Sequence, residues 1–530
     1  MDPTVPFSLE VVLEEALAHH KGGRPREAET GYRAILAHEP RHPIANHNLG
    51  IVLAQAGQVA QSLPLFEAAL EAEPGVDTYR LSLARALLAA NDAGRALTVL
   101  GEGKRFGLSG PAFDALLARA QAARKFSADP DGLFEAAVHQ HKLGKMDEAI
   151  RFYRQAIAAD PRRLEAYENF GVALIAGGHH EEAVKIYRQA LQVAPDNAAM
   201  LDNLGYAYTV QGNIEDAIAS YRQAIALKPD FAEAYNHLGS VLSENGRIAE
   251  GFEAFMTRAR LVYGNGKAPP RQEAEPLHKI KHDREQRDYL AGGKAPDDAP
   301  AVADMFHIEH GERLEGPAVN PANATAQLLD QWNKADPQLV VIENILTDEA
   351  LKQLRLFCAG STVWRRLYSA GYIGAIPADG FAAPLLAQIA EELISTYPQI
   401  LKPHKFHYLG AFKYDSELST GTNTHADFST VNVNFYITPD EANLDPESGG
   451  MEVWDVAAAD TAQLRRLNAD ENAVREFLKT SGARSTIIPH KANRGVIFKS
   501  HLFHKTDNFK FREGYLNKRI NVSLLFGTFK

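Results

Sequence analysis

The chain has 530 residues, enough for two or three domains, and 45% of them are hydrophobic, as in ordinary globular proteins. Its net charge of -11 argues against attraction to nucleic acid, which favours a basic surface. The single cysteine, Cys358, excludes an intramolecular disulfide and a thiolate-rich metal centre. No apolar run of about 18 residues is present, so we expect no transmembrane helix. The N-terminus has no basic segment before an apolar core, which predicts a cytoplasmic protein.

The first half of the chain repeats itself every 34 residues, as the spacing of Gly171, Gly205 and Gly239 shows. Each copy predicts two helices, and a proline ends the second one. This period is similar to that of tetratricopeptide repeats. The predicted copies begin at or near these residues: Leu9, Pro43, Asp77, Pro130, Leu164, Ala198, and Phe231 or Ala232. About seven repeats are therefore expected, in two groups over 9–110 and 130–263, with a helical connection over 111–129.

Stacking of the repeats has a physical cause. One repeat cannot bury its apolar face alone, so successive helix pairs must pack into a curved solenoid with a concave groove. Small residues let the paired helices approach, and aromatic and leucine side chains fill the space between pairs. Grooves of this kind bind peptides, so we expect a peptide or protein partner. The alternative is that the solenoid serves as a rigid arm or holds subunits together.

A segment rich in glycine, proline and charge follows the repeats. We expect residues 264–334 to form a linker, with a hinge or extended bridge at its Gly- and Pro-rich stretches and a charged helix over 276–290. His278 and His282 lie four residues apart on that helix, which superficially resembles a metal-binding pair. No third ligand accompanies them, so a solvated or docking helix is favoured.

Candidate metal ligands lie in the last part of the chain. The sequence His425-Ala-Asp427 precedes an alternating, β-branched and aromatic strand pattern over 430–438. At the start of a strand, two side chains two residues apart point to the same face, so this pair can share one ion. A distant second histidine would complete a 2-His-1-carboxylate site, which suits Fe(II) and leaves coordination positions open.

Three histidines could supply that distant ligand. His501 and His504 are an odd number of residues apart, so on a straight strand only one of them faces inward. His490 precedes a turn, which makes it a weaker candidate. A second alternating strand over 519–526 would place Arg519 on the same face as Asn521 and Ser523. A guanidinium beside a hydroxyl suits a carboxylate ligand.

Residues 335–530 carry these motifs in a characteristic order. The region opens with Leu-Val-Val-Ile-Glu-Asn-Ile-Leu-Thr-Asp-Glu-Ala (339–350), and Tyr414, His425-x-Asp427, a Phe-x-Ser-x-x-x-His run ending at His504, and Arg519 follow. It resembles the 2-oxoglutarate- and Fe(II)-dependent dioxygenases of the prolyl-4-hydroxylase-like group. The resemblance implies a double-stranded β-helix, or jelly roll, with flanking helices. The whole chain would then be a multidomain protein with an all-α tetratricopeptide solenoid followed by that domain.

The resemblance also assigns roles to residues. It implies that His425, Asp427 and His504 hold Fe(II), with His504 preferred to His501. Arg519 would bind the distal carboxylate of 2-oxoglutarate, and O2 is the other co-substrate.

Ser523 and Tyr414 would help to bind 2-oxoglutarate. His504 lies 15 residues before Arg519, further than in most relatives, so we expect a hairpin over 508–516. Helices over 348–358 and 382–397 are expected to pack outside the jelly roll. Residues 455–481, with a helix over 470–479, form a candidate lid.

The implied function is hydroxylation of a C–H bond on a peptide or protein that the solenoid recruits. One alternative is a dioxygenase of a small molecule, such as an amino acid or natural-product intermediate, with repeats used for assembly. Another is a repeat scaffold without turnover. A nucleobase-demethylating dioxygenase is disfavoured by the charge and by Leu525, which stands where the related strand pattern has a second arginine. We expect no membrane partner, and the sequence leaves oligomerisation open.

Overall fold

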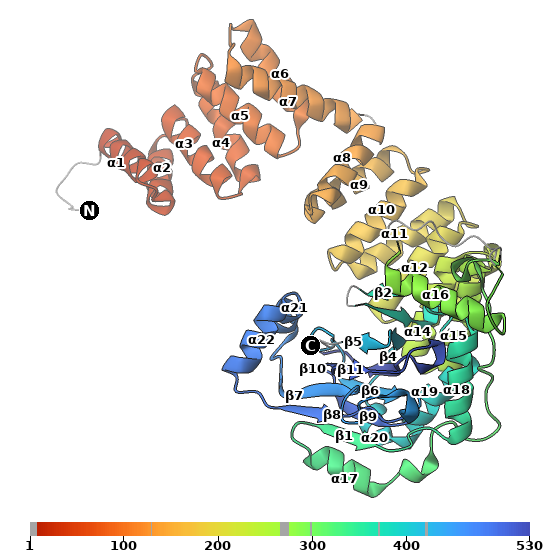
Figure 1. The fold of residues 1–530 in the computed structure, drawn as a ribbon. Coiled ribbons are helices and arrows are strands. Elements are labelled where there is room, and N and C mark those ends of the chain that lie inside the picture. Colours follow the sequence, from red (N-terminus) through yellow and green to blue (C-terminus); the bar gives the residue numbers. More distant parts are fainter. Residues whose placement is uncertain are drawn as a thin grey trace. The chain divides into compact units, whose positions relative to one another are not determined.

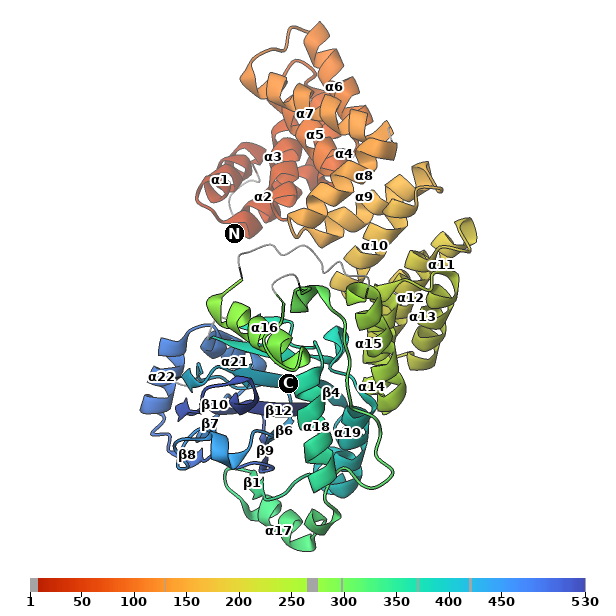
Figure 2. The same ribbon diagram turned by 45° about the vertical axis from the view of Figure 1, so that its right-hand side comes forward.

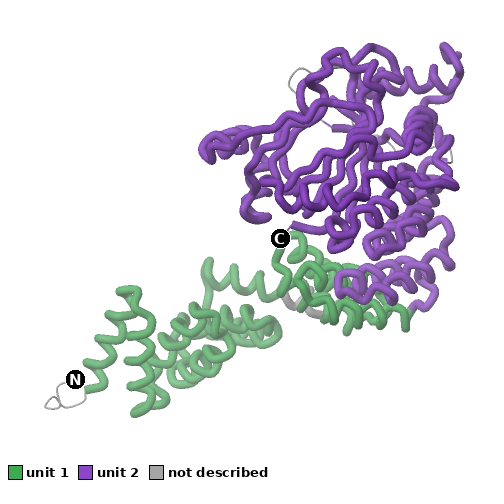
Figure 3. Tube along the Cα trace, turned by 90° about the horizontal axis from the view of Figure 1, so that it is seen from below, with its two compact units in different colours: residues 1–193 green, residues 194–530 purple. Residues whose placement is uncertain are grey.

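The computed structural model describes residues 8–128, 130–264, 275–296, 299–368, 371–418 and 422–529 (Figure 1). The chain forms two compact units, Met1–Val193 and Ala194–Lys530 (Figure 3). The first unit is helical in its described residues, and the second contains helices and antiparallel sheets. None of the described helices is both long and apolar enough to cross a membrane.

The first unit consists of helix pairs. Its helices are α1 (Leu9–Lys21), α2 (Pro25–His38), α3 (Pro43–Gln55), α4 (Val59–Ala72), α5 (Asp77–Ala89), α6 (Ala93–Arg105), α7 (Pro111–Ala128), α8 (Pro130–Lys142), α9 (Met146–Ala159), α10 (Leu164–Ala176) and α11 (His180–Val193). Every predicted repeat start in this unit coincides with the first residue of a helix. The additional helix α7 lies between the two groups of pairs.

Glycine allows the two helices of a pair to pack closely. A Cβ atom added at Gly50 of α3 would lie 2.8 Å from the ring of Phe66 in α4, and one at Gly171 of α10 would meet the ring of Tyr187 in α11. The aromatic residue lies 16 positions after the glycine in both cases. Close packing of a ring against bare backbone thus explains why the glycine recurs with the repeat.

The second unit begins with two more helix pairs and continues into the sheet region. Its helices are α12 (Ala198–Gln211), α13 (Ile214–Leu227), α14 (Ala232–Glu244), α15 (Ile248–Tyr263), α16 (Leu277–Leu290), α17 (Ala326–Lys334), α18 (Asp348–Gly360), α19 (Pro384–Thr396), α20 (Pro398–Leu401), α21 (Thr461–Asn468) and α22 (Glu471–Thr480). Short 3-10 helices are η1 (Val302–Asp304), η2 (Pro321–Asn323), η3 (Pro377–Asp379), η4 (Asp440–Ala442) and η5 (Tyr515–Asn517). The expected helices over 276–290, 348–358, 382–397 and 470–479 correspond to α16, α18, α19 and α22.

The described strands form three antiparallel sheets. They are β1 (Leu339–Ile342), β2 (Arg366–Tyr368), β3 (Tyr372–Ala375), β4 (Phe406–Tyr414), β5 (Glu417–Leu418), β6 (Val431–Tyr436), β7 (Met451–Ala457), β8 (Ser485–Ile488), β9 (Gly495–Lys499), β10 (Leu502–Thr506), β11 (Phe509–Lys510) and β12 (Ile520–Phe526). The major sheet has the order β1-β9-β6-β12-β4-β3-β2, the minor sheet β10-β7-β8, and β11 pairs with β5. The C-terminal part of the chain is therefore a β-rich domain.

A buried cluster joins the major and minor sheets. It contains side chains of β7, β8, β9 and β10, namely Met451, Val453, Ile488, Val496, Phe498 and Leu502. On its other side the major sheet packs against helices, and Figure 2 shows α18 and α19 beside β4, β6 and β12. Alternation along β12 explains this arrangement, because Val522 and Leu524 belong to the helix-covered core while Asn521 and Ser523 face the other side.

The last helix pair is part of the same core. Phe252 of α15 is 1% exposed, and its ring lies 6.1 Å from that of Phe406 in β4. At the end of α15, the Tyr263 hydroxyl donates a hydrogen bond of 2.9 Å to Asp379. Residues of the repeat array thus complete the apolar core of the β-rich domain.

Two expectations about connecting segments differ from the structure or lie beyond it. The predicted hairpin over 508–516 is wrong, because β11 pairs with β5 and Phe511 bridges to Asn443. Pairing with distant strands satisfies the backbone there instead of a local turn. Of the two Gly- and Pro-rich stretches expected to form a hinge or bridge, the first, 264–270, falls almost wholly outside the described residues. Most of the second, 291–300, is described, and its Ala295 is buried and donates its N–H to Asp288.

Candidate metal centre

Three predicted ligands come together beside β6 and β10. The backbones of His425 and His504 are paired, with N–H to O distances of 3.0 and 2.8 Å. Nε2 of His504 lies 3.6 Å from Oδ2 of Asp427, and Nε2 of His425 lies 4.0 Å from its Oδ1. One ligand atom from each residue lies within 4.8 Å of the others. This donor set can hold one metal ion and leave coordination positions free.

Backbone carbonyls orient both imidazoles. Nδ1 of His425 is 3.0 Å from the Asn423 carbonyl, and Nδ1 of His504 is 2.9 Å from the Leu502 carbonyl. A carbonyl only accepts, so each Nδ1 carries the proton and each Nε2 presents its lone pair. Burial also lowers the pKa of His504, which keeps the imidazole neutral and able to bind a metal.

Ala426, the residue between the first two ligands, is held in place by helices α21 and α22. The Asn468 amide accepts from the Ala426 N–H at 3.1 Å and donates to the Ala426 carbonyl at 2.8 Å. Side chains of α21 and α22, including Leu464 and Val474, pack against Ala426 and Phe503. The segment predicted as a lid is thus attached beside the ligands, and its movement stays a prediction.

The other two candidate histidines lie outside the cluster. The His501 ring stacks on Phe529 with centroids 4.7 Å apart. His490 donates from Nε2 to the Thr438 carbonyl at 3.1 Å, and burial lowers its pKa to about 3. The structure therefore brings His504, rather than either of these, to Asp427.

A cavity of about 390 Å³ contains the three ligand residues and a polar wall. The wall comes from β6 and β12, whose register places Asn434 opposite Ser523 and Tyr436 opposite Asn521. Arg519 and Tyr414 line the same cavity. All six residues assigned from the sequence therefore border one space.

Arg519 is a buried cation with free donors. It is 1% exposed, and it donates to the Gly449 carbonyl at 2.6 Å, the Gly450 carbonyl at 2.9 Å and Asn521 Oδ1 at 2.9 Å. A guanidinium has five N–H bonds, so two remain. Among the described residues no carboxylate forms an ion pair with it, and Asp507 acts on it only from a distance. The geometry leaves room for an anionic ligand at the free donors.

Tyr414 and Ser523 have specific local partners. The Arg519 guanidinium lies 4.6 Å from the centre of the Tyr414 ring, a cation–π contact. The Tyr414 hydroxyl is 3.1 Å from Thr506 Oγ1. Ser523 Oγ accepts from the Asn434 amide at 2.8 Å. Tyr414 therefore supports the arginine through its ring, while Ser523 belongs to the polar wall.

The sequence reasoning missed polar residues of β6. Asn432 donates to Asp427 Oδ2 at 2.9 Å, and the Oδ1 atoms of Asn432 and Asn434 are buried without a partner among the described residues. Buried polar atoms normally have hydrogen-bond partners, so these atoms fit a polar ligand. Polar residues at 432 and 434 in an otherwise apolar strand were the available signal.

Comparison with known proteins identifies the repeats. Family profiles described as "TPR repeat" match residues 205–246, and profiles described as "Tetratricopeptide repeat" match 53–120 and 140–204, and also 13–75 and 104–163. The N-terminal part of the chain is therefore a tetratricopeptide repeat array, as its period predicts. No curated protein matches the chain.

Several solved structures resemble part of the chain. MamA from Desulfovibrio magneticus RS-1 shares 19% identity, covering 36% of this chain and 97% of that one, with a TM-score of 0.26. A tetratricopeptide repeat protein from Parabacteroides merdae shares 15% identity, covering 48% and 94%, with a TM-score of 0.23. The first TPR domain of Spaghetti, bound to an HSP90 peptide, shares 25% identity, covering 22% and 91%, with a TM-score of 0.21.

Proposed function

We propose that residues 335–530 form a jelly-roll dioxygenase domain that uses Fe(II), 2-oxoglutarate and O2 to hydroxylate a C–H bond. The observation that carries the proposal is the single cavity that holds a His-Asp-His cluster and a buried, unpaired arginine. Two antiparallel sheets with a shared apolar cluster support a jelly roll.

The residues fit this metal and co-substrate. His425, Asp427 and His504 would hold Fe(II), since two neutral imidazoles and one carboxylate form its usual facial set. The two free N–H bonds of Arg519 would bind a carboxylate of 2-oxoglutarate, beside the Ser523 hydroxyl. When bound, iron and its co-substrates supply the oxidising chemistry that inserts oxygen into a C–H bond.

The chain itself supplies positioning and a shielded site. Asn432 and the backbone carbonyls behind the imidazoles hold the ligands in place. Tyr368 and Tyr372, whose rings stack at 4.6 Å, and Phe428 border the cavity as aromatic surfaces against which a substrate can pack. Such surfaces exclude water from the reacting atoms.

A peptide or protein is the substrate class we favour. The repeat array supports a protein-interaction role, because stacked helix pairs present extended concave surfaces. Recruitment by the repeats would bring a flexible segment of the partner to the cavity. The reaction would then hydroxylate a side chain of that segment.

The test is succinate formation from 2-oxoglutarate by the full-length protein, with and without Fe(II). We expect iron-dependent succinate from the wild type and its loss in both Asp427→Ala and Arg519→Ala. The matched control is Asp330→Ala, which removes an exposed carboxylate of α17 that pairs with Lys334. This variant should retain wild-type turnover.

Calorimetry separates the two halves of the proposal. Asp427→Ala should weaken Fe(II) binding, and Arg519→Ala should weaken 2-oxoglutarate binding to the iron-loaded protein. If the wild type binds neither Fe(II) nor 2-oxoglutarate under anaerobic conditions, the dioxygenase proposal is wrong and the repeat scaffold remains.

A further inference from the structure

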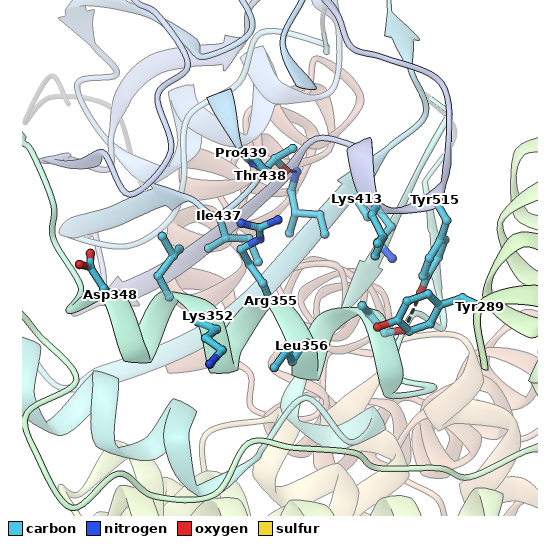
Figure 4. A pocket seen from close by; sticks show the side chains of 14 residues that line it. Tyr289, Asp348, Lys352, Arg355, Leu356, Lys413, Ile437, Thr438, Pro439 and Tyr515 are labelled. Carbon is cyan, nitrogen blue, oxygen red and sulfur yellow. Dashed lines mark hydrogen bonds between the residues drawn. The ribbon is translucent and has the colours of Figure 1, made fainter. Parts of the chain in front are cut away.

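Figure 4 shows a second cavity, of about 380 Å³. Its lining places it on the opposite side of β12 from the candidate metal centre. Ile520 lines this cavity, whereas its neighbours Arg519 and Asn521 line the first one. Successive strand residues point to opposite faces, which explains why the two cavities share no lining residue. The second cavity therefore takes no part in the proposed reaction and needs its own explanation.

The cavity has mostly apolar walls and a size that suits a small ligand. One wall is a face of α18, and the others come from the segment that follows β6, from the start of β12, from η5, and from single residues of α16 and β4. The aliphatic lining side chains are Leu351, Leu356, Ala359, Ile437, Pro439, Leu516 and Ile520. A ligand with an apolar body of several carbon atoms could bury it here.

Cations predominate among the charged lining residues: Lys352, Arg355 and Lys413, against the single acid Asp348. Arg355 extends from α18 toward Ile437 and Thr438, as Figure 4 shows. No carboxylate of the described residues forms an ion pair with it, and Glu441 acts on it only from a distance. Arg355 is exposed as a whole residue, and the partial burial of its guanidinium lowers the pKa of that group.

A second cation occupies the buried end of the cavity. Lys413 of β4 is 2% exposed, and its Nζ lies 3.3 Å from Nε2 of His282 and 4.1 Å from the centre of the Tyr515 ring. Its ammonium has no carboxylate partner within ion-pair distance among the described residues. Burial lowers the pKa of Lys413 to about 7, and the carboxylates of Glu285 and Asp283 act on it only from a distance.

We propose that this cavity binds a small amphipathic carboxylate, whose charge pairs with Arg355 and whose apolar body lies against Leu351, Ile437 and Ile520. The planar guanidinium fork suits a carboxylate. The apolar walls favour one anionic group on an apolar body over inorganic phosphate. The site is independent of the proposed dioxygenase function.

The probe is octanoate, titrated into the full-length protein by calorimetry, with 1-octanol as the neutral match. We expect saturable octanoate binding that Arg355→Gln weakens about tenfold or more, because a charge-assisted pair is lost. Arg151→Gln, which changes an exposed arginine of α9, is the matched control and should bind octanoate as the wild type does.

A second variant tests the location. Leu351→Trp should fill the cavity and abolish binding while melting temperature and circular dichroism stay close to wild type. Asp427→Ala should bind octanoate normally, which distinguishes this cavity from the metal centre. The proposal is overturned if millimolar octanoate does not bind, if 1-octanol binds as tightly, or if Arg355→Gln leaves the affinity unchanged.

Discussion

Asp427 has one side-chain hydrogen bond besides its contacts with the ligand histidines. The Asn432 amide donates to Oδ2 at 2.9 Å, and it reaches this position because β6 begins directly after the ligand segment. A carboxylate held by an amide keeps one orientation and presents its other oxygen to a metal. Asn432 is thus a positioning residue for the proposed metal site.

Replacing Asn432 with alanine should weaken Fe(II) binding by about 10- to 100-fold, the usual cost of losing a group that orients a metal ligand. Anaerobic calorimetry of Fe(II) binding measures the change. Asn434→Ala is the control, since Asn434 lies on the same strand as Asn432 but its amide donates to Ser523 of β12 instead of to a ligand residue. Equal affinities for both variants and the wild type would remove the positioning role.

At the scale of single residues, the sequence predicted the candidate metal ligands but not all the residues that hold those ligands in place. The odd spacing of His501 and His504 indicated that only one faces inward, and the structure places His504 beside Asp427. Asn468, which fixes the Ala426 backbone, lies 42 residues from it in sequence. No local pattern relates two residues at that separation.

In helix α16 the usual distribution of side chains is reversed: polar residues are buried and an apolar residue is exposed. Its buried side chains are polar, including His282 and Gln286, while Leu277 is 84% exposed. The buried face meets a polar cluster in which Lys518 contacts Asp415 at 2.7 Å and Glu285 at 3.0 Å. The charged sequence predicted either a solvated helix or a docking helix. The structure shows α16 docked on the β-rich domain.

His282 makes the stability of this contact depend on pH. Its Nδ1 donates to Asp283 Oδ1 at 3.0 Å, its Nε2 accepts from Lys413, and burial lowers its pKa from 6.5 to about 3. Between pH 6.5 and about pH 3, the His282 imidazole binds a proton in the unfolded chain but not in the folded chain. The free energy of unfolding should therefore fall as pH falls, by about 2 kcal/mol between pH 6.5 and pH 5.

Urea unfolding over a pH series checks this expectation. His282→Gln can keep both hydrogen bonds and does not titrate, so its stability should fall less over the same range. Part of the slope should persist, because burial also lowers the pKa of His490 to about 3. Parallel slopes for the variant and the wild type would show that His282 is not the source.

At the scale of the whole molecule, the repeat array and the β-rich domain share a core. Ile248, Phe252 and Phe255 of α15 belong to the same buried cluster as Phe406 and Val522 of the sheet. The compact units divide at Val193 and Ala194, inside the repeat array. Separating repeats from the β-rich domain at residue 264 would therefore expose core side chains.

Two truncations should behave differently. Residues 194–530 should unfold cooperatively near the melting temperature of the second unit in the full chain. Residues 264–530 should be destabilised by about 5 kcal/mol or more and tend to aggregate, because three large apolar side chains lose their burial. Calorimetric melting and size-exclusion chromatography measure both. Equal stability of the two fragments would show that α15 contributes little to the core.

Local periodicity in the sequence determined the helix pairs, the strands of the candidate site and the chemical types of its ligands, because each depends on neighbours within one repeat or one strand. Every repeat in the first unit begins where its period predicts. The tertiary structure decided that β11 pairs with β5, that α15 completes the sheet's core and that Asn432 and Asn468 hold the ligand segment. These features depend on which distant surfaces bury one another, and that choice follows from packing of the whole chain.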